Sequence, residues 1–364
     1  MGRKGHLWMR IDACRVSRKI LDRIESGFPP GSVSAIFERS IHIEAGDGFL
    51  IHIASAGTPL TPRSIAVPAR CFSTHVRPHA RVGERVVGGQ GCIWWPDSGV
   101  CLSTRDSRVF EAGLDWPADS LPHDVVHRNL IRVMRALESG RTKGTPRSPL
   151  GGYFLARASG VQRPGTVEEQ ARPADKEEKG ISLLVKRSLW AKADSLLEAM
   201  TGKKGTPLRE IAVGMIGLGP GLTPSGDDFL AAFTSVGVAM GRGGGEMGPR
   251  ARALARILLE EAGGRTAPLS AAMFEDASRG EMNEPVLRFI SSILRDQDLA
   301  HAEPYAREVA SIGAFSGEDL LNGAAAALAV FPWPAGVHVE EGSRPPWPMF
   351  WRNQQATANP VRPA

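Results

Sequence analysis

The sequence is short of cysteine, of aromatic residues and of long apolar runs, and each shortage excludes a class of protein. Its four cysteines form no CxxC pair, so neither a cysteine-rich zinc site nor a disulfide framework is indicated, and we expect reduced thiols in a cytoplasmic protein. No apolar run reaches the ~20 residues of a membrane-spanning helix, and the charged N-terminus lacks the apolar segment of a signal peptide. The net charge is only +5 in 364 residues, and no basic face interleaved with aromatic residues indicates a nucleic-acid binder.

The hydrophobic pattern changes along the chain and predicts an α+β protein. Residues 1–30 are amphipathic and predict a lead-in helix. Residues 31–120 contain short β-branched runs split by Gly and Pro, typical of a β-rich barrel or sandwich with antiparallel strands. Residues 121–331 are mostly helical in period, interrupted at 140–180 by a flexible insert from which Tyr153–Leu155 could dock. Residues 332–364 are Pro-rich, and we expect a disordered tail.

A glycine-rich segment opens one of the predicted helices. It reads Gly-Leu-Gly-Pro-Gly-Leu-Thr-Pro-Ser-Gly-Asp-Asp, from Gly217 to Asp228. Its glycines can adopt positive φ and bring backbone N–H groups close to a ligand. Pro224 suits a helix start, and Ser225 is expected to cap the helix with Asp228 three residues on. Such a loop at a helix N-terminus predicts a site for a carboxylate or phosphate, although it is neither a GxGxxG nor a P-loop motif.

The end of this segment is echoed later in the chain. Ser225-Gly226-Asp227-Asp228 corresponds to Ser316-Gly317-Glu318-Asp319, and both copies lead into helices of small residues. Helices that are apolar all round should be buried and can approach closely, so we expect the two acidic N-termini to converge on one pocket. The alternative is that both motifs are only helix caps. On the functional interpretation, the candidate catalytic residues are Asp227, Asp228 and Asp319, and the candidate substrate-binding residues are Gly217, Gly219, Gly221, Thr223, Ser225, Gly226, Ser316 and Gly317.

The signature is similar to the hallmark of the AllH-like family of oxamate carbamoyltransferase subunits. Looser matches to the family pattern are Thr266, Ser270, Gly280 and Glu284, and the resemblance covers about residues 30–331. Phe315 departs from the family pattern, where Thr is commoner. The resemblance implies a subunit of a complex, acting in allantoin and purine breakdown, that converts oxalurate and phosphate into oxamate and carbamoyl phosphate. It therefore implies a small anionic substrate and partner enzyme subunits.

Two other functions remain open from the residues themselves. One is a metal-dependent hydrolase in which Asp227, Asp228 and Asp319 bind Mg²⁺, as in the similar acidic motifs of ADP-ribosylglycohydrolases. The other is a non-catalytic subunit whose glycine loop senses a ligand or docks a partner. Two weaker motifs are not assigned a function. Ser103–Asp106 resembles the S-T-R-T loop of other carbamoyltransferases, but the match covers only four residues. His42 and His52 are expected on a solvated strand face.

Overall fold

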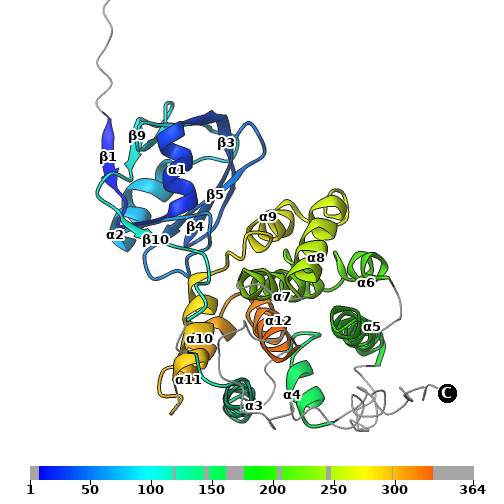
Figure 1. The fold of residues 1–364 in the computed structure, drawn as a ribbon. Coiled ribbons are helices and arrows are strands. Elements are labelled where there is room, and N and C mark those ends of the chain that lie inside the picture. Colours follow the sequence, from blue (N-terminus) through cyan, green and yellow to red (C-terminus); the bar gives the residue numbers. More distant parts are fainter. Residues whose placement is uncertain are drawn as a thin grey trace, which may run out of the picture. The chain divides into compact units, whose positions relative to one another are not determined.

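The chain folds into a sheet-containing unit and a helical unit (Figure 1). The computed structural model describes residues 8–117, 120–142, 147–160, 176–202, 207–242, 247–296 and 298–330. The first unit comprises Met1–Leu114 together with Glu281–Leu287, and the second comprises Asp115–Gly280 together with Arg288–Ala364. The predicted α+β class is confirmed.

The first unit is built on one curled ten-stranded sheet. The strands follow the order β1 (Met9–Asp12), β9 (Val100–Ser103), β8 (Cys92–Trp95), β7 (Arg85–Gly89), β3 (Phe28–Ile36), β4 (Ser40–Glu44), β5 (Leu50–Ser55), β6 (Ser64–Val67), β2 (Arg15–Ser17) and β10 (Arg108–Phe110). Most neighbours are antiparallel, but β1–β9, β5–β6 and β2–β10 are parallel pairs. The expected antiparallel pairing of a barrel or sandwich therefore holds for most neighbours but not for these three pairs, because the alternation within a strand does not reveal the direction of its neighbour.

Local sequence explains the central hairpin of this sheet. β4 and β5 pair with His42 opposite His52, and the turn between them closes through a hydrogen bond from the Ala45 amide to the Phe49 carbonyl, 2.9 Å long. Gly48 has φ 80° in that turn, a conformation that glycine adopts without strain. This hairpin is one of the antiparallel pairs expected for residues 31–120.

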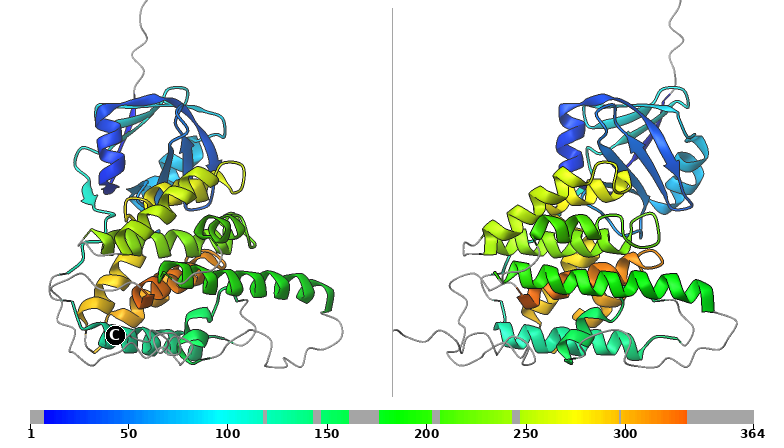
Figure 2. Two further views of the ribbon diagram at one scale, coloured as in Figure 1. Left: turned by 45° about the vertical axis from the view of Figure 1, so that its right-hand side comes forward. Right: turned by 90° about the vertical axis from the view of Figure 1, so that its right-hand side faces the viewer.

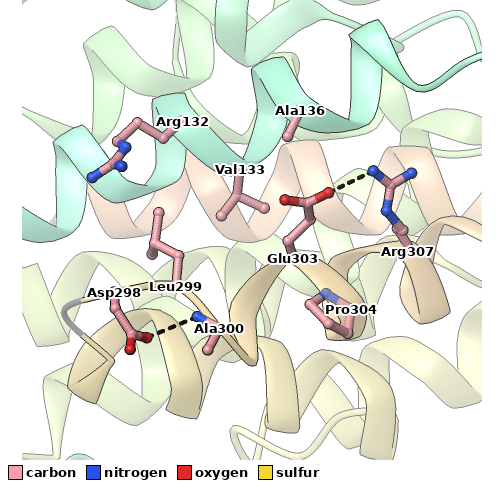
Figure 3. Close-up of a pocket in the computed structure, with 9 residues that line it drawn as sticks. All are labelled: Arg132, Val133, Ala136, Asp298, Leu299, Ala300, Glu303, Pro304 and Arg307. Carbon is pink, nitrogen blue, oxygen red and sulfur yellow. Dashed lines mark hydrogen bonds and ion pairs between the residues drawn. The ribbon is translucent and has the colours of Figure 1, made fainter.

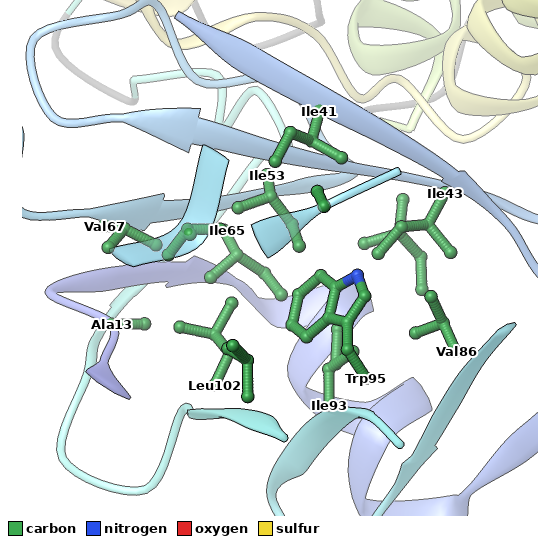
Figure 4. Packing of buried hydrophobic residues seen from close by; sticks show 14 of the residues in the cluster. Ala13, Ile41, Ile43, Ile53, Ile65, Val67, Val86, Ile93, Trp95 and Leu102 are labelled. Atoms are coloured by element: carbon green, nitrogen blue, oxygen red, sulfur yellow. The ribbon is translucent and has the colours of Figure 1, made fainter. Parts of the chain in front are cut away.

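Branched aliphatic side chains fill the inside of the curled sheet (Figure 4). Trp95 lies among Ile43, Ile93 and Val86 and is only 1% exposed. The same core takes in Ile20 from α1 (Arg18–Ser26). The Trp95 indole is therefore part of the packed core of this unit.

The N-terminal segment differs from its prediction. Among residues 8–30, which the structure describes, Arg18–Ser26 alone is helical, with the Ser17 hydroxyl accepting from the Ile20 amide at its start and Gly27 at its end. Residues before it form β1 and β2 instead of a lead-in helix. Both strands pair with partners about 90 residues later in the chain, so their conformation depends on contacts that no local pattern displays.

The rest of the described chain is helical. The helices are α3 (His123–Ser139), α4 (Tyr153–Ala158), α5 (Lys176–Met200), α6 (Leu208–Met215), α7 (Ser225–Gly241), α8 (Met247–Glu261), α9 (Pro268–Ala277), α10 (Glu284–Arg295), α11 (Ala302–Ala310) and α12 (Ser316–Val330). A three-residue helix, α2 (Ala69–Cys71), and two short turns of helix lie between β6 and β7. None of the helices that the structure describes combines the length and apolar character of a membrane span.

Two helices of small residues form the centre of the helical unit. α7 and α12 pack side by side (Figure 2), and α7 is buried from Ser225 to Met240. Gly323 permits this close approach, since a Cβ there would lie 2.4 Å from the carbonyl oxygen of Phe229. The prediction that both helices are buried is confirmed, and their N-termini hold the two acidic motifs.

The predicted insert at 140–180 is partly ordered. Residues 147–160 pack into the helical unit: Leu150, Tyr153 and Phe154 are buried, and α4 begins at Tyr153. α5 begins within the same stretch, at Lys176. The docking expected of Tyr153–Leu155 is confirmed for Tyr153 and Phe154, whereas α4 and the start of α5 are regular helix where a flexible insert was expected. Residues 143–146 and 161–175, and the predicted tail after residue 331, lie outside the described residues.

Candidate functional site

The glycine loop joins α6 to α7. Gly217, Gly219 and Gly221 all have positive φ, at 74°, 126° and 103°, as predicted. At Gly217 a Cβ would also lie 2.3 Å from the carbonyl oxygen of Arg265, so this position requires glycine for space as well as for conformation. Leu222 at the tip is 72% exposed. The loop is thus tightly held at its base and open to solvent at its tip.

Asp227 holds the base of this loop. One carboxylate oxygen accepts from the Gly217 amide at 2.8 Å, and the other accepts from the Thr266 hydroxyl. Burial raises the pKa of Asp227, and the donors Thr266 and Gly217 oppose that rise. Because both of its oxygens are engaged by the protein, Asp227 connects the loop, α7 and the start of α9.

Asp228 is buried, and only one of its two carboxylate oxygens has a hydrogen-bond partner among the described residues. It is 1% exposed, and its Oδ2 accepts from the Thr223 hydroxyl at 3.0 Å. Its Oδ1 is buried with no hydrogen-bond partner in the described part of the chain. Burial raises the pKa of Asp228 to about 7, although the hydroxyls of Ser316 and Thr223 favour the ionised form. An unpaired buried carboxylate oxygen is unfavourable, so it indicates a proton or a ligand group at this place.

Asp319 has the same arrangement on α12. It is 0% exposed, its Oδ1 accepts from the Ser148 hydroxyl, and its Oδ2 has no partner among the described residues. Burial raises the pKa of Asp319 to about 8, and the charge of Asp228 adds to the rise. The Ser225 hydroxyl lies beside Asp319 without a well-formed hydrogen bond, and it favours the ionised form together with Ser148.

The two acidic motifs meet at neighbouring helix N-termini. The Thr223 hydroxyl lies 2.9 Å from the Ser316 hydroxyl, so the loop before α7 touches the first residue of α12. Each serine lies beside the aspartate of the other motif: Ser316 beside Asp228 and Ser225 beside Asp319. The predicted convergence of the motifs is confirmed.

The motifs also repeat the role of their first acidic residue. Glu318 accepts from the Ser148 amide at 3.0 Å and pairs with Arg141, as Asp227 accepts from the Gly217 amide. In each motif the first acid binds a backbone N–H of a neighbouring segment, and the second acid is left with an unpaired oxygen. The repeat seen in the sequence is therefore a repeat of structure.

The glycine that follows the serine in each of the two motifs lies tightly against neighbouring main chain. The Gly226 amide donates to the Leu218 carbonyl and the Gly317 amide to the Ile312 carbonyl, both at 2.9 Å. A Cβ at Gly226 would lie 2.2 Å from the Met215 carbonyl oxygen. The expected cap at Ser225 was wrong: Pro224 occupies the N-cap position, no side chain caps α7, and Ser225 is its first helical residue.

Ser148 was not foreseen from the sequence. It lies in the segment expected to be flexible, 171 residues from Asp319. The available signal was the apolar run after it, since a buried Tyr153–Phe154 pair must bring the preceding residues onto the helices. Of the looser matches, Thr266 binds Asp227 and Ser270 is buried nearby. A Cβ at Gly280 would lie 3.3 Å from the Ala239 nitrogen, and Glu284 pairs with Arg15.

The side chains of the described residues do not by themselves form a metal site. No group of three or more His, Cys, Asp or Glu side chains is placed to hold a metal ion within the residues that the structure describes. Asp227 uses both carboxylate oxygens on protein donors, so only Asp228 and Asp319 keep an unpaired oxygen at this place.

Two other features stand apart from this site. His42 and His52 form a ring pair with centroids 5.1 Å apart, so the two side chains share one face of the sheet, and both are partly exposed. Burial lowers the pKa of His52 to about 3. A hollow of about 540 Å³ lies between α3 and α11 and is lined by residues such as Arg132, Asp298 and Glu303 (Figure 3). None of the predicted site residues lines that hollow.

Comparison with known families identifies both parts of the chain. The model described as oxamate carbamoyltransferase subunit AllH matches residues 215–328, which contain both acidic motifs. The model described as the AllH family N-terminal domain matches residues 11–109, which contain the curled sheet. No curated protein and no solved structure gives a match. Since the two family matches together cover more than half of the sequence, the chain belongs to the AllH family of oxamate carbamoyltransferase subunits.

Proposed function

We propose that the chain carries a substrate site of an enzyme complex that converts oxalurate and phosphate into oxamate and carbamoyl phosphate. The observation that carries the proposal is the pair of buried aspartates, Asp228 and Asp319, each with one unpaired oxygen, at two adjoining helix N-termini. Strongly raised carboxyl pKa values beside specific polar partners are typical of catalytic groups. The reaction is proposed from the name of the family. The two aspartates are proposed as the groups that donate and accept its protons.

The glycine loop is suited to hold an anion. Within the described part of the chain, the amides of Gly219 and Gly221 donate to no main-chain carbonyl, so both remain able to donate to a ligand. The loop leads into the N-terminus of α7, where the helix dipole favours negative charge. Both oxalurate and phosphate are anions. We therefore assign the anionic group of the substrate to this loop and the reacting group to the aspartates.

The reaction requires one proton to leave and another to arrive. A phosphate oxygen forms a bond to the carbamoyl carbon of oxalurate, and the bond from that carbon to the inner nitrogen breaks with its electron pair staying on nitrogen. The nitrogen must take up a proton to leave as the amide of oxamate, while hydrogen phosphate loses one. In the proposal Asp319 donates to the nitrogen and Asp228 accepts from the phosphate. The number of protons in the pair is then unchanged.

A direct test is turnover by the chain together with its partner subunits. The assay supplies oxalurate and phosphate and measures the carbamoyl phosphate formed. We expect turnover with the complete set of subunits and little from the isolated chain. Asp228→Asn should abolish it, whereas Asp22→Asn, an exposed carboxyl of α1, should not.

The outcomes separate the candidate functions. Full activity of the Asp228→Asn complex would show that the aspartate is architectural. Turnover that is unaffected by removing this chain would make it a non-catalytic, ligand-sensing subunit. Strong metal-dependent hydrolysis by the isolated chain would instead support the hydrolase alternative.

A further inference from the structure

Ser148 contacts the acidic start of α12 through two separate groups. Its amide donates to Glu318, and its hydroxyl donates to Oδ1 of Asp319. The residue is 1% exposed and lies in neither range that matches the family models. Nothing in the family match therefore assigns it a role, although it touches one of the two half-satisfied carboxyls.

In the structure the Ser148 hydroxyl donates to Oδ1 of Asp319. The Leu150 amide donates to the Ser148 oxygen at 3.1 Å, which occupies one of the two lone pairs of that oxygen and leaves the hydroxyl hydrogen available for Asp319. In this arrangement Oδ1 of Asp319 is an acceptor. A proton on the same carboxyl then lies on Oδ2, the oxygen that has no partner in the described residues.

Two hydrogen bonds hold the segment that contains Ser148 against α5 and α12. The Pro149 carbonyl accepts from the Trp190 indole at 3.0 Å, and the Phe154 amide donates to the Asn322 side chain of α12 at 2.9 Å. These two bonds do not involve the Ser148 hydroxyl, so they remain when it is removed. The Leu150 amide does lose its acceptor in Ser148→Ala, so thermal stability has to be measured beside each effect of that variant, and Ser148→Thr restores the acceptor.

The charged groups near Asp319 are few. Asp228 on α7 is the carboxyl coupled to it, and Asp227 on the same helix is engaged by Gly217 and Thr266. On α12 itself Glu318 is paired with Arg141. No cation of the described chain pairs with Asp319, so hydroxyl donors are what organise it.

We propose that Ser148 is a positioning residue that holds Asp319 with its proton on Oδ2, ready to be given to the leaving nitrogen of the substrate. The proposal rests on the function proposed above. It deepens that function by stating which oxygen donates and what orients it. Ser148 itself does not touch the reacting atoms; it acts through Asp319.

The first experiment measures protonation of the carboxyl without any reaction. Carboxyl carbons of aspartate are labelled with ¹³C in the full chain, and the titration of Asp319 is followed by NMR, assigned by its loss in Asp319→Asn. Ser148→Ala removes a donor that favours the ionised form, so the Asp319 transition should move to higher pH. Ser148→Thr restores the hydroxyl and should return the transition toward that of the wild-type chain.

The second experiment measures catalysis in the reconstituted complex. Since the proposed donor must be protonated, the fall of kcat on the alkaline side should follow the Asp319 transition and move to higher pH in Ser148→Ala. We expect kcat to drop about tenfold or more, as is usual when a reacting group loses its orientation, with a much smaller change in KM. Ser148→Thr should recover most of the rate.

An Asp319 transition that is the same in the wild-type chain and in Ser148→Ala would overturn the proposal. So would a loss of rate in Ser148→Ala that matches a loss of thermal stability and leaves the pH profile unchanged. A shifted transition in a complex that forms no carbamoyl phosphate would contradict the proposed function, while supporting the contact between Ser148 and Asp319 as the determinant of its protonation.

Discussion

Replacing Asp319 by Asn should remove a pH dependence of stability that the wild-type chain carries. Burial raises the pKa of Asp319 to about 8 in the folded chain, whereas an unfolded aspartate has a pKa of about 3.9. Between these values the folded chain keeps a proton that the unfolded chain has lost. The associated stability is thus fully present below about pH 4 and is lost as the pH rises toward 8.

The size of the effect follows from the linkage. One excess proton in the folded state lowers the free energy of unfolding by about 1.4 kcal/mol for each pH unit. From about pH 5 to about pH 7, Asp319 alone should therefore remove about 3 kcal/mol. Asn has the same shape, stays neutral and can still accept from the Ser148 hydroxyl, so the variant should lose this slope while keeping the fold.

Urea unfolding followed by far-ultraviolet circular dichroism measures this, because most of the helices lie in the unit that contains Asp319. The wild-type chain, Asp319→Asn and the exposed control Asp22→Asn are compared at several pH values across the window. We expect the control to keep the wild-type slope and Asp319→Asn to be flatter. If the wild-type chain and Asp319→Asn show parallel slopes, the Asp319 carboxyl is already ionised when folded, and the reasoning from burial is wrong.

Three further variants test the other parts of the site. Asp228→Asn should abolish carbamoyl phosphate formation by the reconstituted complex with little change in Tm, because Asn keeps the size of Asp but cannot accept the proton. If activity is lost only through unfolding, Asp228 has a structural role. Ser316→Ala should lower the free energy of unfolding by about 1 kcal/mol, since it removes the hydroxyl beside Thr223. A fall in activity at unchanged stability would instead indicate that Ser316 contacts the ligand. Gly226→Ala should destabilise the chain by about 1–3 kcal/mol or more, because the new Cβ would lie 2.2 Å from the Met215 carbonyl oxygen; a variant with the wild-type Tm would refute this close contact.

Much of the site could be predicted because its determinants are local. Positive φ at Gly217, Gly219 and Gly221 follows from their close spacing in one short loop. The buried helices follow from runs of small residues that have no polar face. The pairing of the two acidic motifs follows from their repeat, since two similar helices without a polar face have to cover each other.

Other parts could not be predicted because they depend on residues distant in sequence. β1 pairs with β9, and β2 pairs with β6 and β10. The hydrogen bonds of both strands thus come from distant residues, and their own pattern resembled the start of a helix. The expected cap at Ser225 assumed that the helix begins one residue later than it does. Ser148 belongs to a stretch whose composition indicated flexibility, and its contact with Asp319 arises only when α4 packs against α12.

By itself the sequence determined that the chain has a β-rich and a helical region, that a glycine loop precedes one acidic helix start, and that a second such start exists. These properties depend on which residues are neighbours along the chain. Only the tertiary structure decided which carboxyl has both oxygens hydrogen-bonded and which keeps an unpaired oxygen. Asp227 and Asp228 are adjacent and chemically identical, yet Asp227 is satisfied by Gly217 and Thr266 while Asp228 keeps an unpaired, buried oxygen. The protonation of a carboxyl depends on its burial and on the donors around it in space, and the order of residues does not contain that information.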